Sequence, residues 1–391
     1  MTQRQVATDV WARETGDLVM AEFGRGQGRG QGRGQGRGQG RGQGRGQGRG
    51  QGRGQATDHA GGESSVGLSD ALAAVHDGLG FSWNGSNALT SLPTRLGSTD
   101  PTDTRYLTAE TRGNLADSLL AQAFSVAPSA GGATLSVGTT PTVSLAAPGR
   151  AFFQAQMVFL RSYADLRADR IGEIDLQIDD MLSFFGLVGL LNDSRRLRTL
   201  ELLSAVIRLA VHVEMPFKHY CRSLRPIDHS PMVMPVIQTP DHSTFPSGHA
   251  MESFAAATVL DHLCRGTVWP ADGRRSLPFQ IAHRIALNRT VAGVHFPVDS
   301  LAGALVGCRI GDAVRRMAHA MPLAGGTLAV APASDTMMTL GAQNYAALDD
   351  FTLAVVNAAC PLDTDAAGTP AGVIGAMWRL AAAEWQDQVA P

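Results

Sequence analysis

Three short blocks of this chain concentrate side chains that could bind and transform an anion. They lie at residues 218–226, 246–249 and 289–299. The first block begins with Lys218, which is the only lysine among 33 basic residues. Arginine serves wherever a solvated charge is enough, so a single lysine indicates a place where a compact ammonium group must fit against one oxygen.

The cations of these blocks suit a tetrahedral oxyanion. Lys218 supplies a point charge, and Arg225 and Arg289 supply planar guanidinium groups that each hold oxygens through two hydrogen bonds. Ser247 adds a hydroxyl donor, and Gly248 at the start of a helix lets backbone N–H groups approach an anion closely. We therefore predict that these five residues bind one oxyanion.

Two histidines and one aspartate remain for chemistry. One of His249 and His295 can serve as nucleophile or axial ligand, and the other as acid–base. Asp299 follows His295 by four residues, so it can hold one imidazole nitrogen and leave the other free to attack. Each residue taken singly also has a structural explanation. A lone His295 is more often a structural histidine, and Asp299 suits the first turn of a helix.

The elements that must position these blocks read as helices. Apolar residues recur with helical spacing over residues 195–220, where Pro216 is predicted to kink or end the helix. Further helices are predicted at residues 151–168, 172–191, 248–263 and 277–290, from Pro297 onward, and near residues 68–78, 108–124, 340–358 and 371–387. No stretch alternates with period two, so we predict an all-α fold, a helical bundle with flanking helices.

The N-terminal region is dominated by a low-complexity repeat. Residues 24–54 repeat Arg-Gly-Gln-Gly and hold eight arginines and no acidic residue. Such a segment has nothing to bury, so residues 1–60 are predicted to form a disordered tail. Gly/Arg-rich tails can hold RNA, but the repeat lacks interleaved aromatic residues, which favours a flexible spacer or a simple repeat expansion. Without these eight arginines, 33 basic residues fall to 25 against 35 acidic ones, which argues against nucleic-acid binding by the folded part.

The remainder is expected to have three parts. Residues 61–149 form an irregular and helical leader, residues 150–320 form the catalytic helical core, and residues 321–391 form C-terminal helices that pack on this core. Apolar residues make up 44% of the chain, which is enough for a sizeable core.

Composition predicts a soluble, cytoplasmic protein, with export left open. The four cysteines lie far apart without a Cys-x-x-Cys pair, as is typical of reduced structural thiols. The N-terminus lacks an apolar signal segment, and no stretch is long and apolar enough to span a membrane. A zinc site is disfavoured, because there is no His-Glu-x-x-His motif and dense positive charge repels a bare cation.

In order and spacing, the three blocks resemble the signature of the superfamily of type 2 phosphatidic acid phosphatases (PAP2) and vanadium-dependent haloperoxidases. The resemblance covers residues 218–299 and has one departure, Asn288, where the family usually has serine. It implies an α-helical bundle whose Lys218, Arg225 and Arg289 bind the equatorial oxygens. His295 would also contact the oxyanion, as the attacking nucleophile of a phosphatase or as the ligand to vanadium in a haloperoxidase. It also implies roles for His249, which would protonate the leaving group or handle protons of bound peroxide, and for Asp299, which would orient His295.

Two reactions fit this resemblance. The loop before the second block favours a vanadium-dependent haloperoxidase, with vanadate as cofactor and bromide as the preferred halide, because His242 falls where bromoperoxidases of the family carry histidine. The alternative is a soluble acid phosphatase without a cofactor, which hydrolyses phosphate monoesters through a phosphohistidine. The short spacing between the second and third blocks favours this alternative. A non-catalytic oxyanion-binding protein is the second alternative. The expected partners are small molecules, hydrogen peroxide and halide or a phosphate ester, with homodimer formation left open.

Overall fold

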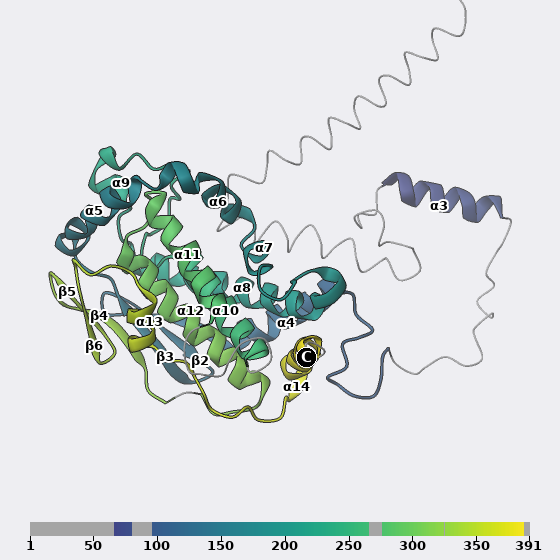
Figure 1. Ribbon diagram of the computed structural model, residues 1–391. Helices are drawn as coiled ribbons and strands as arrows, with labels where there is room; N and C mark the ends of the chain where they lie inside the picture. Colours follow the sequence, from purple (N-terminus) through teal and green to yellow (C-terminus); the bar gives the residue numbers. More distant parts are fainter. Residues whose placement is uncertain (1–65, 80–95, 266–275, 324, 387–391) are drawn as a thin grey trace, which may run out of the picture. The chain divides into compact units, whose positions relative to one another are not determined.

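The computed structural model describes residues 66–79, 96–265, 276–323 and 325–386 (Figure 1). The chain divides into two units, Met1–Thr94 and Arg95–Pro391. The described residues of the first unit form the helix α3 (Val66–Gly78), as predicted. The tail predicted at residues 1–60, with its repeat, lies outside the described residues. The division into leader, core and C-terminal part stays a prediction.

Four helices form the centre of the second unit: α8 (Asp193–Cys221), α10 (Gly248–Cys264), α11 (Leu277–Val291) and α12 (Pro297–Ala318). These helices confirm the predictions for residues 195–220, 248–263 and 277–290 and for the helix that opens at Pro297. Helix α8 continues through Pro216, and its irregular backbone lies instead at Arg196, with a φ angle of −135°.

Helices α10 and α12 lie very close together because α12 carries glycine at every fourth position. A Cβ atom on Gly303 would lie 2.3 Å from the Ser247 carbonyl oxygen, and one on Gly307 would lie 2.4 Å from the Met251 carbonyl oxygen. Only a residue without a side chain permits such an approach. The glycine stripe therefore seats α12 directly on the backbone of α10, including the residue that caps α10.

Smaller helices surround this centre. Helices α4 (Ala109–Ala123) and α14 (Gly372–Gln386) contact α8, whereas α5 (Arg150–Ala164) and α6 (Arg167–Asp179) contact α11. The predicted helix over 172–191 was wrong in its second half, because α6 ends at Asp179 and only the single turn α7 (Leu182–Phe185) follows. Short turns α9 (Pro226–His229) and η3 (Pro231–Val233) precede the second block.

The prediction of an all-α fold was wrong, because the unit also contains a six-stranded mixed sheet that packs against α8 and α12. Its strands are β1 (Phe124–Ser129), β2 (Gly132–Val137), β3 (Thr140–Ala146), β4 (Leu328–Ser334), β5 (Met337–Leu340) and β6 (Gln343–Ala346). They lie in chain order, with β3 and β4 parallel and every other pair antiparallel.

The strands escaped prediction because each is only four to seven residues long. The period-two signal is nevertheless present in β2, where Ala133, Leu135 and Val137 are buried and the residues between them are less so. The helix predicted over 340–358 was also wrong: this stretch holds the end of β5, then β6 and the short helix α13 (Leu353–Ala359).

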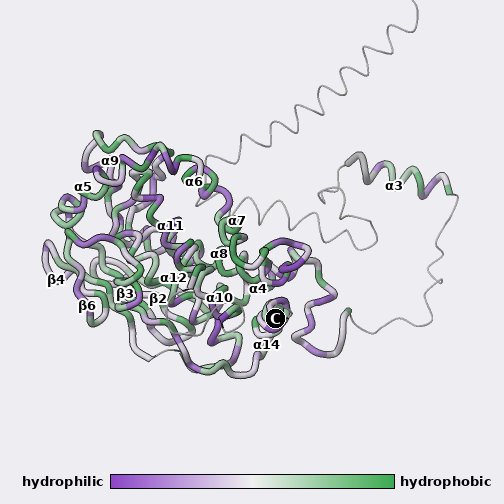
Figure 2. Tube along the Cα trace, in the orientation of Figure 1, coloured by the Kyte–Doolittle hydropathy of each residue, from purple (hydrophilic) through white to green (hydrophobic). Residues whose placement is uncertain are grey.

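Polar residues interrupt even the central helices (Figure 2). Within the part of the chain that the structure describes, no helix combines the length and the apolar character that crossing a bilayer requires.

Candidate active site

The three blocks meet where α8 ends and where α10 and α12 begin. Lys218 lies in the last turn of α8, Ser247 caps α10, and Asp299 lies in the first turn of α12. The backbone N–H of Ser247 donates to the Asp299 carbonyl oxygen at 2.9 Å, which joins the second block to the third. Helix ends and loops thus supply the polar groups, while the helix bodies supply the rigid core.

Lys218 holds the loop that leads into α10. Its Nζ donates to the Pro246 carbonyl oxygen at 2.7 Å and to the Ser243 carbonyl oxygen at 3.2 Å. These bonds use two of the three ammonium donors. The side chain is buried, and burial lowers its pKa to about 8. A compact ammonium between two carbonyl groups agrees with the preference for lysine at this position.

Arg225 binds both the loop and the third block. Its Nε donates to the His242 carbonyl oxygen, and its Nη1 donates to the Val294 carbonyl oxygen, each at 2.9 Å. Nη1 also lies 3.1 Å from His295 Nε2, and Nη2 lies 3.0 Å from His242 Nδ1. Because arginine only donates, His295 Nε2 is the acceptor in its contact and carries no proton, whereas His242 Nδ1 also lies 3.4 Å from the Ser243 carbonyl oxygen. His295 therefore presents the lone pair of Nε2 towards a cation.

The other side of His295 faces a buried carboxylate. Nδ1 lies 3.2 Å from Asp299 Oδ2, and that oxygen accepts from the Thr244 hydroxyl at 2.5 Å and from the Phe296 N–H at 2.8 Å. Burial raises the pKa of Asp299 to about 6. Burial, with the positive charges of Arg225 and Lys218, lowers the pKa of His295 well below its ordinary value. At neutral pH the pair therefore consists of a carboxylate and a neutral imidazole with its proton on Nδ1.

The N-terminus of α10 completes the arrangement. Ser247 is fully buried, and among the described residues its Oγ has no hydrogen-bond partner. Gly248 begins the helix, where backbone N–H groups and the helix dipole favour an anion. His249 follows and is half-buried, and its charge is among those that depress the pKa of His295, after burial and the two cations.

Arg289 and Asn288 have partners on α6. Arg289 Nη2 donates to the Ile174 carbonyl oxygen and to Gln177 Oε1, both at 3.0 Å. Asn288 Nδ2 donates to Glu173 Oε2 and to Gln177 Oε1, both at 3.0 Å. Asn288, the one departure from the family pattern, thus donates to α6. The role of Arg289 in binding the anion stays a prediction.

Sequence reasoning missed two residues of this region. Thr244 bridges His295 and Asp299, and nothing in its loop distinguished it from its neighbours. Glu214 lies one helical turn before Lys218, and its carboxylate packs against Gly248. The spacing of an acidic residue four positions before a lysine is a recognised helical pair and could have drawn attention to it.

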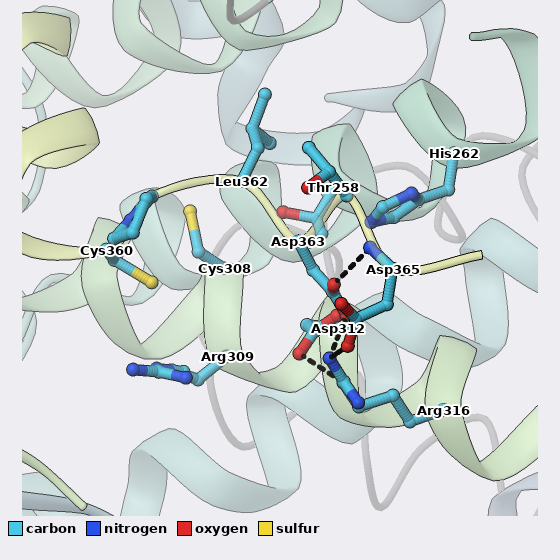
Figure 3. Close-up of a pocket in the computed structure, with 12 residues that line it drawn as sticks. Thr258, His262, Cys308, Arg309, Asp312, Arg316, Cys360, Leu362, Asp363 and Asp365 are labelled. Atoms are coloured by element: carbon cyan, nitrogen blue, oxygen red, sulfur yellow. Dashed lines mark hydrogen bonds and ion pairs between the residues drawn. The ribbon is translucent and has the colours of Figure 1, made fainter. Parts of the chain in front are cut away.

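A cavity of 270 Å³ lies elsewhere, between α10, α12 and the segment that follows α13 (Figure 3). None of the predicted site residues lines it. Several of its charged groups bind each other: Arg316 pairs with Asp312 at 3.2 Å and with Asp365 at 2.6 Å. This cluster fastens the chain after α13 to α12, so we place the candidate active site at His295.

Comparisons with known proteins agree with this location. The model of the PAP2 superfamily matches residues 199–321, which run from α8 to just beyond α12. Two proteins named decaprenylphosphoryl-5-phosphoribose phosphatase, from Mycobacterium tuberculosis strains CDC 1551 / Oshkosh and ATCC 25618 / H37Rv, are each 32% identical over 128 residues. The aligned part is 33% of this chain and 66% of each relative, so the chain spans just under two thirds of their length.

Among solved structures, a bacterial vanadium-dependent iodoperoxidase matches 29% of this chain and 31% of its own, with 23% identity and a TM-score of 0.25. A structural similarity this weak says nothing about the reaction. The family match contains all three blocks in their expected order, and residues 199–321 of this chain belong to the PAP2 superfamily.

Proposed function

We propose that this protein is a phosphatase that hydrolyses phosphate monoesters through a phosphohistidine on His295. The observation that carries the proposal is the state of this imidazole: Nδ1 faces Asp299 and Nε2 is held unprotonated beside Arg225. A neutral imidazole oriented in this way is a competent nucleophile. The curated relatives, both named as phosphatases, support the same reaction class.

In the first step, Nε2 of His295 attacks phosphorus and the bond from phosphorus to the leaving oxygen breaks. Lys218, Arg225 and the Ser247 hydroxyl would hold the phosphoryl oxygens, and they would bind the charge that builds up on them in the transition state. His249 would donate a proton to the leaving oxygen, which departs as an alcohol. Asp299 would stabilise the positive charge that the imidazole acquires.

In the second step, water attacks the phosphohistidine. His249, now without its proton, would take a proton from this water, and the bond between phosphorus and His295 Nε2 breaks. Inorganic phosphate leaves, and both histidines return to their initial states. Each step therefore uses one nucleophile and one acid–base group, which matches the two histidines present.

A vanadium-dependent haloperoxidase is the second candidate, and the contact between His242 and Arg225 favours it. Burial lowers the pKa of His242 to about 3, so it stays neutral beside the pocket. The residues fit vanadate, because Ser247 Oγ is buried without a hydrogen-bond partner among the described residues and His295 Nε2 carries a lone pair. Lys218, Arg225 and Ser247 would hold its oxygens, and His295 would ligate the metal. When bound, vanadate would supply the activation of hydrogen peroxide for halide oxidation, with bromide preferred.

We rank the phosphatase above the haloperoxidase because the curated relatives are named as phosphatases. The loop motif that contains His242 had favoured the haloperoxidase. In the deciding experiment, the purified protein is incubated with p-nitrophenyl phosphate. In a separate assay it is incubated with vanadate, hydrogen peroxide, bromide and a halogen-accepting dye. We expect ester hydrolysis that vanadate inhibits, and a phosphohistidine that accumulates in the His249→Ala variant. His262→Ala, on the same helix, is the matched control and should behave as wild type.

Dye bromination that depends on added vanadate, without ester hydrolysis, would replace the first candidate by the second. Binding of phosphate without either activity would favour a non-catalytic oxyanion-binding protein. The expected cytoplasmic location stays a prediction, and homodimer formation stays open as the sequence left it.

A further inference from the structure

The carboxylate of Glu214 lies beside the N-terminus of α10, where the second block is predicted to bind an anion. The residue lies on α8, one turn before Lys218, and its side chain is buried. A Cβ atom on Gly248 would lie 2.1 Å from Glu214 Oε2 and 2.7 Å from Oε1. Any residue other than glycine at the start of α10 would therefore displace this carboxylate.

Glu214 Oε2 is buried and accepts no hydrogen bond from any residue that the structure describes. An ionised carboxylate in such a place normally accepts two or more hydrogen bonds, because its desolvation is otherwise uncompensated. An oxyanion bound at the same helix end would add a second negative charge beside the first. The two can share the pocket only if a proton lies between them, as it does between paired carboxylates.

We propose that Glu214 takes up one proton when a phosphate or phosphoryl group binds, and that the resulting carboxylic acid donates a hydrogen bond to one oxygen of that anion. The proton comes from solvent, and no other bond forms or breaks. The identity of the anion rests on the proposed function. Glu214 thus makes binding depend on pH and selects ligands with an oxygen free to accept this hydrogen bond.

The charges around Glu214 agree with this assignment. Burial raises its pKa, while Lys218 and Arg225 act in the opposite direction. A bound anion must raise that pKa further, because it adds a like charge. Between the pKa values of the free and the bound protein, affinity therefore falls as pH rises. The other charged or titratable groups at the pocket are His242 from the loop, His249 and Glu252 from α10, and His295 and Asp299 from the third block.

The test is calorimetric binding of inorganic phosphate and of sulfate to the full-length protein, in buffers of different ionisation enthalpy. Sulfate keeps a constant charge across the range studied, so any proton uptake on its binding belongs to the protein. We expect the wild type to take up a proton and to lose affinity by about tenfold per pH unit between the pKa values of Glu214 in the free and the bound protein. Glu214→Gln should take up one proton fewer and bind sulfate more tightly than wild type at about pH 8.

Glu252→Gln is the matched control, because it removes another buried carboxylate, on α10 itself, and leaves the contact of Glu214 with Gly248 in place. It should keep the proton uptake of the wild type. Sulfate and phosphate binding with the same proton uptake and pH slope in wild type and Glu214→Gln would overturn this inference and leave the proposed function intact. Failure of both proteins to bind phosphate at any pH would overturn the proposed function, and this inference with it. Absence of proton uptake by the wild type would overturn this inference even if Glu214→Gln does not fold.

Discussion

Replacing Asp299 by asparagine should abolish most activity and yet stabilise the fold. The carboxylate is fully buried, and burial raises its pKa from 3.8 to about 6, although the bonds from Thr244 and Phe296 favour the ionised form. A rise of this size corresponds to about 3 kcal/mol. The folded protein binds this proton more tightly than the unfolded chain does. The ionised carboxylate therefore costs stability in full above about pH 6, and the cost fades as pH falls towards the unfolded value of 3.8.

Asparagine carries no charge, so it avoids this cost while its side-chain oxygen can still accept from Thr244 and Phe296. The free energy of unfolding should rise by up to about 3 kcal/mol at pH 8 and by less than about 1 kcal/mol at pH 4. Activity should nevertheless fall by about 10⁴-fold, the loss known for the aspartate-to-asparagine change in the catalytic triad of a serine protease. A neutral amide no longer stabilises the positive charge that His295 acquires when it attacks phosphorus.

Urea unfolding at the two pH values, together with hydrolysis of p-nitrophenyl phosphate, measures both effects. Asp261→Asn is the matched control, because Asp261 is also fully buried but binds Arg265 at the end of α10. Its replacement should destabilise the protein at pH 8, since it leaves the partly buried Arg265 without its charged partner. The reasoning is refuted if Asp299→Asn loses stability at pH 8, or if it keeps more than about a tenth of wild-type activity.

Two further predictions concern the elements around the pocket. Arg289→Ala should weaken orthovanadate binding by about 2 to 4 kcal/mol in calorimetry, because a charge-assisted contact in a partly desolvated site is lost. Gln177→Ala removes an acceptor shared by Arg289 and Asn288 but leaves the guanidinium in place, so an equal loss in that variant would mean that Arg289 acts by holding α6. Gly303→Ala would place a Cβ atom 2.3 Å from the Ser247 carbonyl oxygen, so it should lower both phosphate affinity and melting temperature. Gly311→Ala meets Thr258 instead and should lower only the melting temperature, and equal effects of the two variants on affinity would contradict the proposed link between α12 and the cap of α10.

Local signals in the sequence determined most of the candidate site. The order and spacing of the three blocks identified Lys218, Arg225, His249, His295 and Asp299 without any structure. Helix periodicity located the elements that carry them, because α8, α10, α11 and α12 are long enough for an apolar face to recur several times. The four-residue spacing of His295 and Asp299 implied their contact, because such residues share one face of a turn.

Tertiary structure alone decided the contacts between segments that are distant in the chain. The parallel pairing of Val143 with Leu328 joins two short meanders into one sheet. Nothing in the sequence of either meander indicates which strand it pairs with. In the same way, Thr244 reaches Asp299, and the carboxylate of Glu214 fills the space that Gly248 leaves open. Hydrophobic periodicity reports how a segment folds on itself and which face it buries. The partner that covers that face depends on chain closure and side-chain fit, which are properties of the whole fold.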